Sequence, residues 1–455
     1  MTRMTPPKPT PGPRRNSLWR LARGFRRDVL SALPPHLYHA WMADFRSPLI
    51  RTVLCNDPAL VRLVLTDRPQ DFPKSPRLGE GLAPLLSRSV FVTNGDEWAR
   101  QRRIIDPAFA GGRLRDSLPA MWDAGRAAVA RMLDCAGGTP VDIEPETSHA
   151  AADVIFRTMF SLPIEHDLAR RIFAAFRSHQ DAQPIVNLAA VVPLPAWMPR
   201  FHSRQTRQTA ATIRRLITQL VTDRSRAIAD GTAPDDLATR IMTTPDPETG
   251  QTFADAEMVD QVAIFFLAGH ETSASALAWA LWLLAANPDW QDRVAAESLS
   301  LPPDRAPDLS DIARLTDTRA VFRETLRLYP PVPMMVRQTT QTERLRDRTL
   351  PPGTQVVLSP WHLQRHDRLW PDPDAFDPSR WGRPENRGPA RDAFIPFSAG
   401  QRVCPGAGFA MIEGPLLLAM ICRAVRLTPG DVAPVPVARL TVRGQGGISV
   451  RLRPR

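Results

Sequence analysis

Lysine is almost missing from this chain: among its 455 residues it occurs only at Lys8 and Lys74. Arginine therefore supplies nearly all of the positive charge, and the formal net charge is +11. A basic chain can indicate nucleic-acid binding. Here, however, the arginines are scattered among acidic residues, with no basic run beyond the N-terminus. The sequence therefore predicts no nucleic-acid partner, and we interpret the charge mainly as a composition bias.

Cysteine is also scarce, and its spacing excludes two kinds of site. Cys55, Cys135, Cys404 and Cys422 form no C-x-x-C pair. Neither a zinc site nor the disulfide framework of a small secreted protein has this spacing. Reduced cysteines in an intracellular protein fit best, so we expect a cytoplasmic location. Apart from Cys404, we interpret the cysteines as ordinary buried residues.

No linker, charge block or repeat divides the interior of the chain. Its length exceeds the usual limit for one hydrophobic core, but we expect a single large domain over residues 31–455. Residues 1–30 are proline-rich and basic, and we expect them to be disordered. They lack the apolar core of a signal peptide, so we expect no transmembrane anchor. Residues 14–27 have one apolar face among arginines, which can touch a membrane surface but more often packs on the domain.

Helical periodicity dominates the chain. The most apolar stretch, residues 262–286, is long enough to cross a bilayer, but it contains His270 and Glu271, which favours a buried helix of a soluble protein. Strand patterns cluster near the two ends, at 49–56, 354–359 and 438–451. Together these patterns predict a mainly α fold with a small β-rich subdomain. The expected helices are 57–66, 98–109, 118–135, 148–160, 205–230, 255–287, 289–297 and 318–329.

One loop near the C-terminus, Phe397-Ser-Ala-Gly-Gln-Arg-Val-Cys-Pro-Gly406, carries the most information. Pro405 suits a first helical position and an apolar run follows, so we expect a helix to begin at Cys404. A thiolate there would face unpaired N–H groups at the positive end of the helix, which lower its pKa and favour metal ligation. Gly400 would allow a backbone conformation that other residues avoid, and Gly406 a close approach to a large ligand.

The spacing F-x-x-G-x-R-x-C-x-G resembles the haem-binding loop of the cytochrome P-450 family. The resemblance implies the cytochrome P-450 fold, with Cys404 as the proximal iron ligand of haem b (iron protoporphyrin IX). Phe397 would shield the sulfur, and Arg402, which is always charged, would pair with a haem propionate. An anionic sulfur ligand favours O–O cleavage, so the resemblance implies oxygen activation.

A second segment lies within the apolar helix: Ala268-Gly269-His270-Glu271-Thr272. Gly269 weakens the helix locally and opens space beside the backbone, and Thr272 can bond an earlier carbonyl or offer its hydroxyl to that space. Taken alone, these residues favour a solvated Glu271 and a back-bonded Thr272. With Cys404 present, the segment resembles the family's A-G-x-(D/E)-T motif. There the threonine hydrogen-bonds the dioxygen to be activated, and the acid helps to deliver protons.

Two further segments resemble the family's propionate-binding residues. Trp98 and Arg102 match its W-x-x-x-R helix, although this chain has Gln101 where the family often has histidine. Arg337 occupies the position of another propionate-binding arginine. Taken alone, each of these two arginines would be an ordinary surface charge.

Glu324 and Arg327 form the spacing of the family's E-x-x-R motif, and Arg380 lies in a segment that resembles its companion. Exposed pairs of this kind contribute little to stability. The resemblance implies a buried structural clamp behind the haem loop.

We therefore predict a haem-thiolate monooxygenase of the soluble bacterial type, which inserts one oxygen atom of O2 into an apolar small molecule such as a fatty acid, terpene or polyketide. Electrons would come from a ferredoxin or flavodoxin with an NAD(P)H-dependent reductase. A peroxide-driven or rearranging haem-thiolate enzyme, and a non-catalytic haem-binding or sensor protein, are the alternatives. The intact acid–alcohol pair and the absence of an output domain weigh against them.

Two surfaces complete these predictions. The substrate pocket should include an access-loop segment at 191–199 and a loop at 77–92. Its other wall residues should be Phe265, Phe266, Ala268, Val332, Met334 and Met335. The electron donor should be acidic and meet Arg100, Arg103, Arg387 and Arg391.

Overall fold

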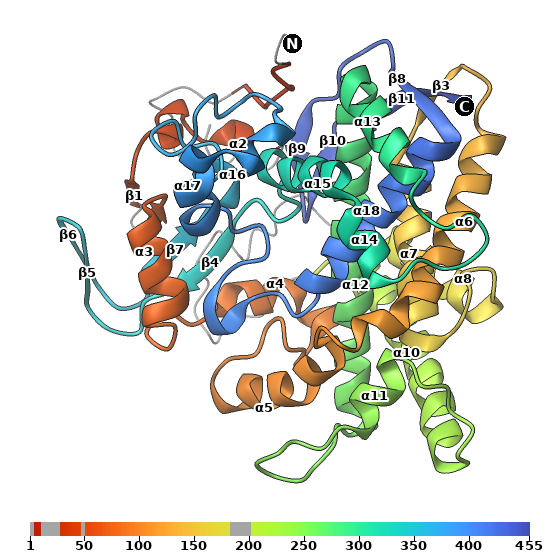
Figure 1. Cartoon of the computed structure of the whole chain (residues 1–455). Helices are drawn as coiled ribbons and strands as arrows, with labels where there is room; N and C mark the ends of the chain where they lie inside the picture. Colours follow the sequence, from red (N-terminus) through yellow and green to blue (C-terminus); the bar gives the residue numbers. More distant parts are fainter. Residues whose placement is uncertain (1–3, 11–27, 47–50, 183–201) are drawn as a thin grey trace.

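The structure is a computed structural model, and it describes residues 4–10, 28–46, 51–182 and 202–455. Helices make up most of the described residues, as the sequence predicted. Figure 1 shows the strands β4 and β7 with short helices on one side of the molecule, and the long helices on the other. Helix α12 (Asp255–Ala285) runs through the helical side from top to bottom. The predicted segments 14–27 and 191–199 lie outside the described residues.

The helices follow the apolar periodicity of the sequence. The longer ones, besides α12, are α4 (Pro76–Leu86), α5 (Gly95–Ile105), α6 (Leu118–Asp134), α7 (Glu144–Phe160), α8 (Asp167–Ala182), α10 (Arg204–Ala229), α13 (Pro288–Ser298), α15 (Thr316–Leu328) and α18 (Ala407–Ala424). The shorter ones are α2 (Val29–Ala32), α3 (Pro58–Arg62), α11 (Leu237–Thr243), α14 (Leu309–Arg314), α16 (Pro360–Leu363) and α17 (Arg387–Asp392).

Local chemistry decides where several helices begin. Asp57 caps α3 by accepting a hydrogen bond from the Ala59 N–H (2.9 Å), and Pro58 occupies the first position. The helix beyond Cys404 begins later than predicted. Residues 404–406 form a turn and α18 begins at Ala407, so the predicted start at Cys404 is wrong by three positions.

The strands form four small sheets. The largest has the order β1-β2-β7-β4, with β1 (Met42–Arg46), β2 (Arg51–Cys55), β7 (Gln355–Leu358) and β4 (Met335–Gln338). Only the β2–β7 pair of this sheet is parallel. The others are β3-β11-β8, from Pro140–Asp142, Ser449–Pro454 and Val425–Pro429, and the hairpins β5–β6 (Glu343–Leu345, Arg348–Leu350) and β9–β10 (Pro436–Ala438, Val442–Gly444).

Helix α12 is apolar on nearly all sides, and α7, α10, α15 and α18 pack around it. Near its C-terminal end, the Trp279 ring stacks on the Tyr329 ring with a centroid distance of 3.9 Å. Within the described part of the chain, one helix, α18, has the length and composition of a membrane span, and 61% of it is buried inside the protein.

The N-terminal residues 4–10 differ from the expected disorder. The Phe376 N–H donates to the Met4 carbonyl (3.0 Å), and the Tyr329 hydroxyl donates to the Pro7 carbonyl (2.6 Å). Lys8 forms an ion pair with Asp374. This segment therefore packs on the main body. Its prolines have no backbone N–H to donate, but the backbone carbonyl groups still accept hydrogen bonds.

The residues predicted to form a clamp lie together in the core. Glu324 on α15 accepts from the Arg327 guanidinium at 2.8 and 3.0 Å and from Arg380 Nε at 2.9 Å. Both Glu324 and Arg327 are 0% exposed, and Arg380 is 1% exposed. The arginines also donate to backbone carbonyls of residues 371–375, among others. The cluster thereby joins α15 to the segment before the Cys404 loop.

We predict that Glu324→Ala strongly destabilises the protein, because it leaves two buried arginines facing each other without an acid. Removing one partner of a buried pair typically costs about 3–5 kcal/mol. Urea unfolding of Glu324→Ala and of the isosteric control Glu324→Gln measures the effect. The glutamine keeps an acceptor oxygen, so the control should lose less stability. A Glu324→Ala protein as stable as the wild type would contradict the clamp.

Candidate functional site

The middle of α12 is partly accessible although most of the helix is buried. Phe265, Ala268 and Thr272 are partly or fully exposed. Their spacing of three and four residues places them on the same side of the helix. The Thr272 hydroxyl donates to the Ala268 carbonyl at 2.6 Å. This face therefore presents one apolar ring, one small residue and one alcohol.

Glu271 lies on a different side of α12 from Thr272 and is buried. It accepts from the Thr441 hydroxyl at 3.0 Å and forms an ion pair with Arg443 of β10. Burial raises the pKa of Glu271, and the charge of Arg443 opposes this effect. The acid–alcohol pair is therefore divided between two sides of one helix.

Two residues of this segment do not act as predicted. A Cβ on Gly269 would lie 2.5 Å from Ile155 Cδ1 on α7, so the glycine allows two helices to approach and does not open space for a ligand. Phe266 is buried against the rings of Phe156, Phe160 and Phe176. It is therefore a core residue and not part of a pocket wall.

The other residues predicted to line the substrate pocket are partly accessible to solvent. Val332, Met334 and Met335 are half-buried, and Phe265 contacts Phe109 with a centroid distance of 5.9 Å. The predicted loop 77–92 is largely helix, because α4 extends to Leu86.

The Cys404 loop folds tightly around its cysteine. Gly400 has φ +65°, and a Cβ there would lie 2.1 Å from the Leu65 carbonyl oxygen, so this position requires glycine. Gly406 has an ordinary φ of −81°, and its backbone N–H bonds the Cys404 sulfur. The Cys404 N–H donates to the Phe397 carbonyl at 2.9 Å.

The Cys404 side chain is accessible to solvent, yet the protein surrounds it closely enough to change its acidity. Burial raises the pKa of the thiol, while the Gly406 N–H and the charge of Arg102 act in the opposite direction. The predicted lowering of the thiol pKa is therefore not found, because burial outweighs the Gly406 N–H and the charge of Arg102. A metal ion would itself deprotonate the sulfur on binding.

Several cations gather around the Trp98 ring beside this loop. Arg402 lies 4.6 Å from its centroid, and Arg102 and Lys74 each lie 5.8 Å from it. Arg102 also donates to the Val403 carbonyl at 2.8 Å, which ties α5 to the loop. Arg337 belongs to the same group. Burial lowers the pKa of Lys74, and the charges of Arg402, Arg337 and Arg102 lower it further.

Three of these cations are buried without an acid. Lys74 donates to the carbonyls of Val90 and Thr93, and Arg402 to the Asn94 side chain. The Arg337 Nε has no hydrogen-bond partner, and burial followed by the charge of Arg402 lowers the Arg337 pKa to about 10. Among the residues that the structure describes, none of the three pairs with a carboxylate.

Buried cations without counter-charge are unfavourable. A haem carries two negatively charged propionates, so these buried cations fit the cofactor that the sequence implied. The structure unites Trp98, Arg102, Arg337 and Arg402 as predicted. It adds Lys74, which the sequence reasoning missed because no spacing motif includes it.

The remaining sequence candidates lie outside this cluster. Gln101 is buried and donates to the Arg88 carbonyl at 2.7 Å, so it has a structural role. Acidic partners neutralise three of the four arginines expected to meet an electron donor, since Arg100 pairs with Glu257, Arg103 with Asp246 and Arg391 with Asp392.

We predict that Gly269→Ala is destabilising by about 1–3 kcal/mol through overpacking, although alanine favours helix. Ile155→Val removes Cδ1, the nearer of the two side-chain atoms that the new Cβ would meet, and leaves Cγ1 at 2.9 Å. The double variant should therefore be more stable than the two single changes predict, by about 1 kcal/mol. Urea unfolding of all four proteins measures this coupling. If the stability losses of the two single variants simply add, and Gly269→Ala also loses haem, the packing explanation is wrong and Gly269 borders the cofactor instead.

Comparison with known proteins shows the family of this chain. The family model "Cytochrome P450" matches residues 6–449. Cyclooctat-9-en-7-ol 5-monooxygenase of Streptomyces melanosporofaciens is 34% identical over 417 residues, which cover 91% of this chain and 86% of the relative. Human cytochrome P450 4F2 is 28% identical and covers 93% of this chain and 84% of its own.

A solved structure of the cytochrome P450DA heme domain has the same fold. Its TM-score is 0.81 at 23% identity, and the match covers 99% of this chain and 98% of that one. With the family model spanning nearly the whole length, the chain belongs to the cytochrome P450 family and is a haem-thiolate monooxygenase enzyme.

Proposed function

We propose that this protein binds haem b through Cys404 and inserts one oxygen atom from O2 into an apolar organic substrate, with electrons from a separate redox protein. The observation that supports it most is the buried cation group Lys74, Arg337 and Arg402 beside the Cys404 loop. These side chains have no acidic partner in the described parts of the chain. One haem-binding domain over residues 31–455 and a cytoplasmic location are parts of this proposal.

The haem would supply the capacity to bind and cleave O2, which a thiolate ligand favours. The chain's own residues have three tasks. Cys404 holds the iron, the cations on Trp98 hold the propionates, and Phe397 packs beside the loop and limits water. Thr272 orients dioxygen with its hydroxyl, and Glu271 holds the proton that must reach this side of α12.

The substrate class follows from the accessible side chains. Phe265, Phe109, Val332 and Met334 offer carbon and sulfur surface, which favours an apolar molecule. The Streptomyces relative carries a cyclic alkenol in its name, so we favour a terpene-like or similar cyclic lipid over a fatty acid. Apolar walls distinguish such substrates weakly.

A ferredoxin or flavodoxin with an NAD(P)H-dependent reductase is the proposed electron source. Of the four arginines considered for its docking, only Arg387 is exposed and has no acidic partner within the described residues. We therefore expect this surface to attract an acidic electron donor less strongly than four unpaired arginines would.

Cys404→His tests the ligand. The wild-type ferrous–CO complex should have the red-shifted Soret band of thiolate ligation, and the variant should have the band of imidazole ligation. Cys422→His is a poor control because that cysteine is buried in α18. Cys135→Ser, at a half-buried position, is the matched control and should keep the wild-type spectrum. An unchanged spectrum in Cys404→His would contradict this assignment.

Thr272→Ala tests the reaction. Without the hydroxyl, NAD(P)H consumption should continue while hydrogen peroxide replaces most of the product, since positioned acid–base groups typically contribute about 10²–10⁴-fold. Thr272→Ser keeps the hydroxyl and should retain coupling. If Thr272→Ala forms product from added peroxide as well as the wild type does from O2, the peroxide-driven alternative gains support.

A further inference from the structure

Both tyrosines of this chain lie in one series of aromatic rings, although the chain has only 2 tyrosines against 11 tryptophans. Tyr329, the residue after α15, stacks on Trp279 of α12 with a centroid distance of 3.9 Å and an interplanar angle of 8°. Tyr329 also meets Trp361 of α16 at a centroid distance of 6.1 Å. Trp361 Nε1 donates to the Tyr38 hydroxyl at 2.8 Å. These four rings therefore form one continuous series, the aromatic path.

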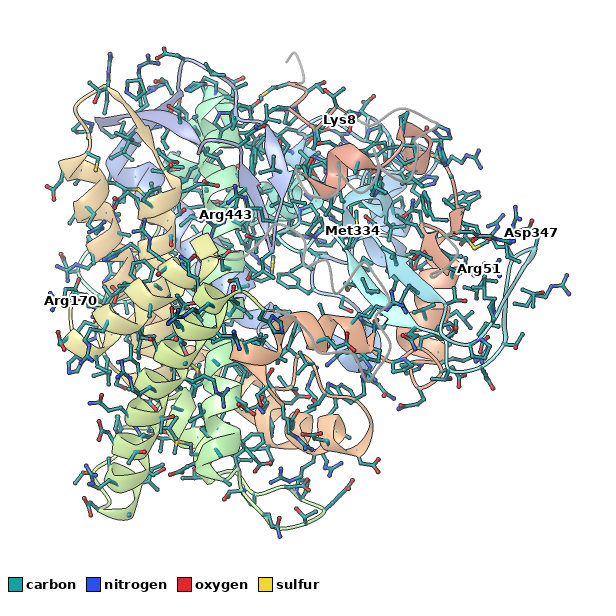
Figure 2. The ribbon with its side chains drawn as sticks, turned by 180° about the vertical axis from the view of Figure 1, so that it is seen from behind. Lys8, Arg51, Arg170, Met334, Asp347 and Arg443 are labelled. Atoms are coloured by element: carbon teal, nitrogen blue, oxygen red, sulfur yellow. The ribbon has the colours of Figure 1, made fainter. Side chains whose placement is uncertain are left out.

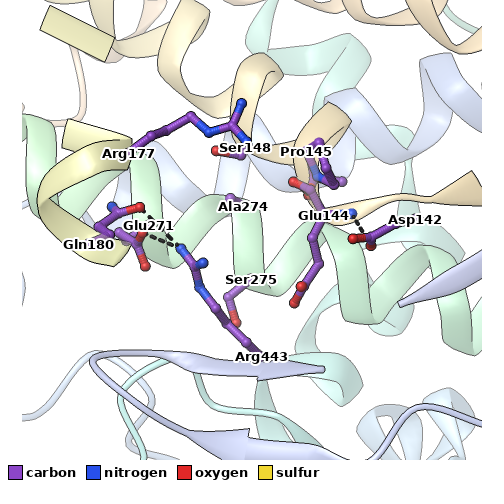
Figure 3. A pocket seen from close by; sticks show the side chains of 11 residues that line it. Asp142, Glu144, Pro145, Ser148, Arg177, Gln180, Glu271, Ala274, Ser275 and Arg443 are labelled. Atoms are coloured by element: carbon purple, nitrogen blue, oxygen red, sulfur yellow. Dashed lines mark hydrogen bonds and ion pairs between the residues drawn. The ribbon is translucent and has the colours of Figure 1, made fainter. Parts of the chain in front are cut away.

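The inner end of the aromatic path lies on the side of α12 that carries Thr272. Trp279 follows Thr272 by seven residues, which places it on the same side of the helix and about 10 Å further along the axis. The Val442 carbonyl accepts from Trp279 Nε1 at 3.0 Å. Figure 3 shows Ser275 pointing to the strand that carries Arg443, where its hydroxyl bonds the same carbonyl at 2.6 Å. The Trp279 ring is therefore held in one orientation close to the proposed reaction site.

The outer end of the aromatic path reaches the surface. Trp279, Tyr329 and Trp361 are each 0% exposed, whereas Tyr38 is half-buried. Lys8 of the N-terminal segment has its Nζ 5.0 Å from the centroid of the Tyr38 ring, and Figure 2 labels Lys8 near the upper edge of the molecule. The path therefore leads from the core at α12 to a ring that a small soluble molecule can approach.

The chemistry of these rings suits the movement of single electrons. Indole and phenol rings lose one electron more easily than the phenylalanine and aliphatic side chains of this core, and electrons pass readily between rings in contact. Burial raises the pKa of both Tyr329 and Tyr38, and the charge of Arg365 opposes this effect. Both tyrosines therefore stay protonated at neutral pH, and each must release its proton when an electron leaves.

Arg365 decides on which ring an electron vacancy rests. Its guanidinium lies 3.9 Å from the Trp361 centroid and 5.4 Å from the Tyr329 centroid. A cation at this distance makes a positive charge on Trp361 unfavourable and favours loss of a phenol proton. The Tyr329 hydroxyl donates to the Pro7 carbonyl, which is too weak a base to keep that proton. The vacancy therefore rests on Tyr38, at the accessible end.

Other tryptophans lie outside this series. Trp370 meets Trp381, which in turn meets Phe394. Trp98 lies beside the Cys404 loop, but three cations surround its ring and make the loss of an electron from it unfavourable. Both tyrosines of the chain belong to the aromatic path, so a tyrosyl radical in this protein can form only there.

We propose that the aromatic path protects the enzyme by letting oxidising equivalents leave the haem site when no substrate takes the activated oxygen atom. This rests on the proposed monooxygenase function. In each passage Trp279 gives one electron to the oxidised haem. The vacancy moves through Tyr329 and Trp361 to Tyr38, which releases its phenol proton to water.

A soluble one-electron donor such as ascorbate or a thiol completes each passage. It returns one electron and one proton to the Tyr38 radical and is itself oxidised. Two passages, with two protons taken up at the haem site, convert the unused oxygen atom to water.

The first test detects the radical. Haem-loaded ferric protein without substrate is mixed with a peracid and frozen rapidly, and electron paramagnetic resonance records the tyrosyl signal. Trp279→Phe keeps both tyrosines but removes the inner end of the aromatic path, so most of the signal should be lost. Trp370→Phe is the matched control and should keep the wild-type signal, because Trp370 is also buried (1% exposed) and also donates to a backbone carbonyl (Leu363, 3.2 Å).

The second test measures protection. During NAD(P)H consumption without substrate, Tyr38→Phe and Trp361→Phe should lose haem absorbance several-fold faster than the wild type, because the oxidising equivalents stay in the core. Added ascorbate should slow this loss in the wild type and have little effect in Tyr38→Phe. A purely structural role predicts a lower melting temperature in these variants, with a wild-type radical signal and haem lifetime. That result would overturn the proposal.

Trp98 is the competing exit, since it lies beside the Cys404 loop. Loss of the tyrosyl signal in Trp98→Phe that still has the thiolate ferrous–CO band, with a wild-type signal in Trp279→Phe, would overturn the proposal. A wild type that forms product but no tyrosyl radical would overturn the aromatic path alone. A wild type that forms the Trp279-dependent radical with peracid but no product from O2 would support the path and contradict the monooxygenase function.

Discussion

The packing of α12 is the constraint on which the rest of this structure depends. A helix that is apolar on almost every side must be surrounded, and α7, α10, α15 and α18 surround this one. Each polar residue on it then needs a partner from a neighbouring element. Ser148 of α7 bonds His270, Val442 of β10 bonds Ser275, and Arg443 pairs with Glu271. The helix therefore fixes the C-terminal hairpin and α7 as well as its own accessible face with Phe265, Ala268 and Thr272.

Charge is buried in two different ways around this helix. The Glu324 cluster is complete within the protein, because its acid meets two arginines and backbone carbonyls accept the remaining donors. The group around Trp98 is incomplete: Arg102 pairs with Asp106, but Lys74, Arg337 and Arg402 meet carbonyls and an amide and no acid within the described residues. A complete cluster indicates a structural role, and an incomplete one indicates that a ligand supplies the missing charge. This contrast separates the clamp from the cofactor site without reference to relatives.

The sequence predicted what depends on local patterns. Helix positions followed from apolar periodicity, and the spacing around Cys404 pointed to the loop and its ligand. Gly400 needs its conformation because of a local turn, so it was also predictable. Gly269 and Phe266 were misread because the neighbours of each side of a helix depend on tertiary packing, here on Ile155 and on three phenylalanines. Lys74 was missed because no spacing motif includes it, and Arg443 was missed because its partner Glu271 lies 172 positions away in the sequence.

Two buried acids lie next to the segment of α12 that holds Thr272: Glu271 on α12 itself, and Glu413 of α18, which accepts from the Ser273 hydroxyl at 2.7 Å. Burial raises the pKa of Glu413 to about 7, with only the Ser273 hydroxyl opposing it. No cation pairs with Glu413 among the described residues, and one of its oxygens has no partner. Burial therefore favours the neutral form of this acid. Glu271 has a raised pKa as well, but it pairs with Arg443, whose side chain is 32% exposed and lines a polar cavity. The two acids therefore differ in their access to the surface, because Glu271 reaches it through Arg443 and the cavity, whereas Glu413 is 1% exposed.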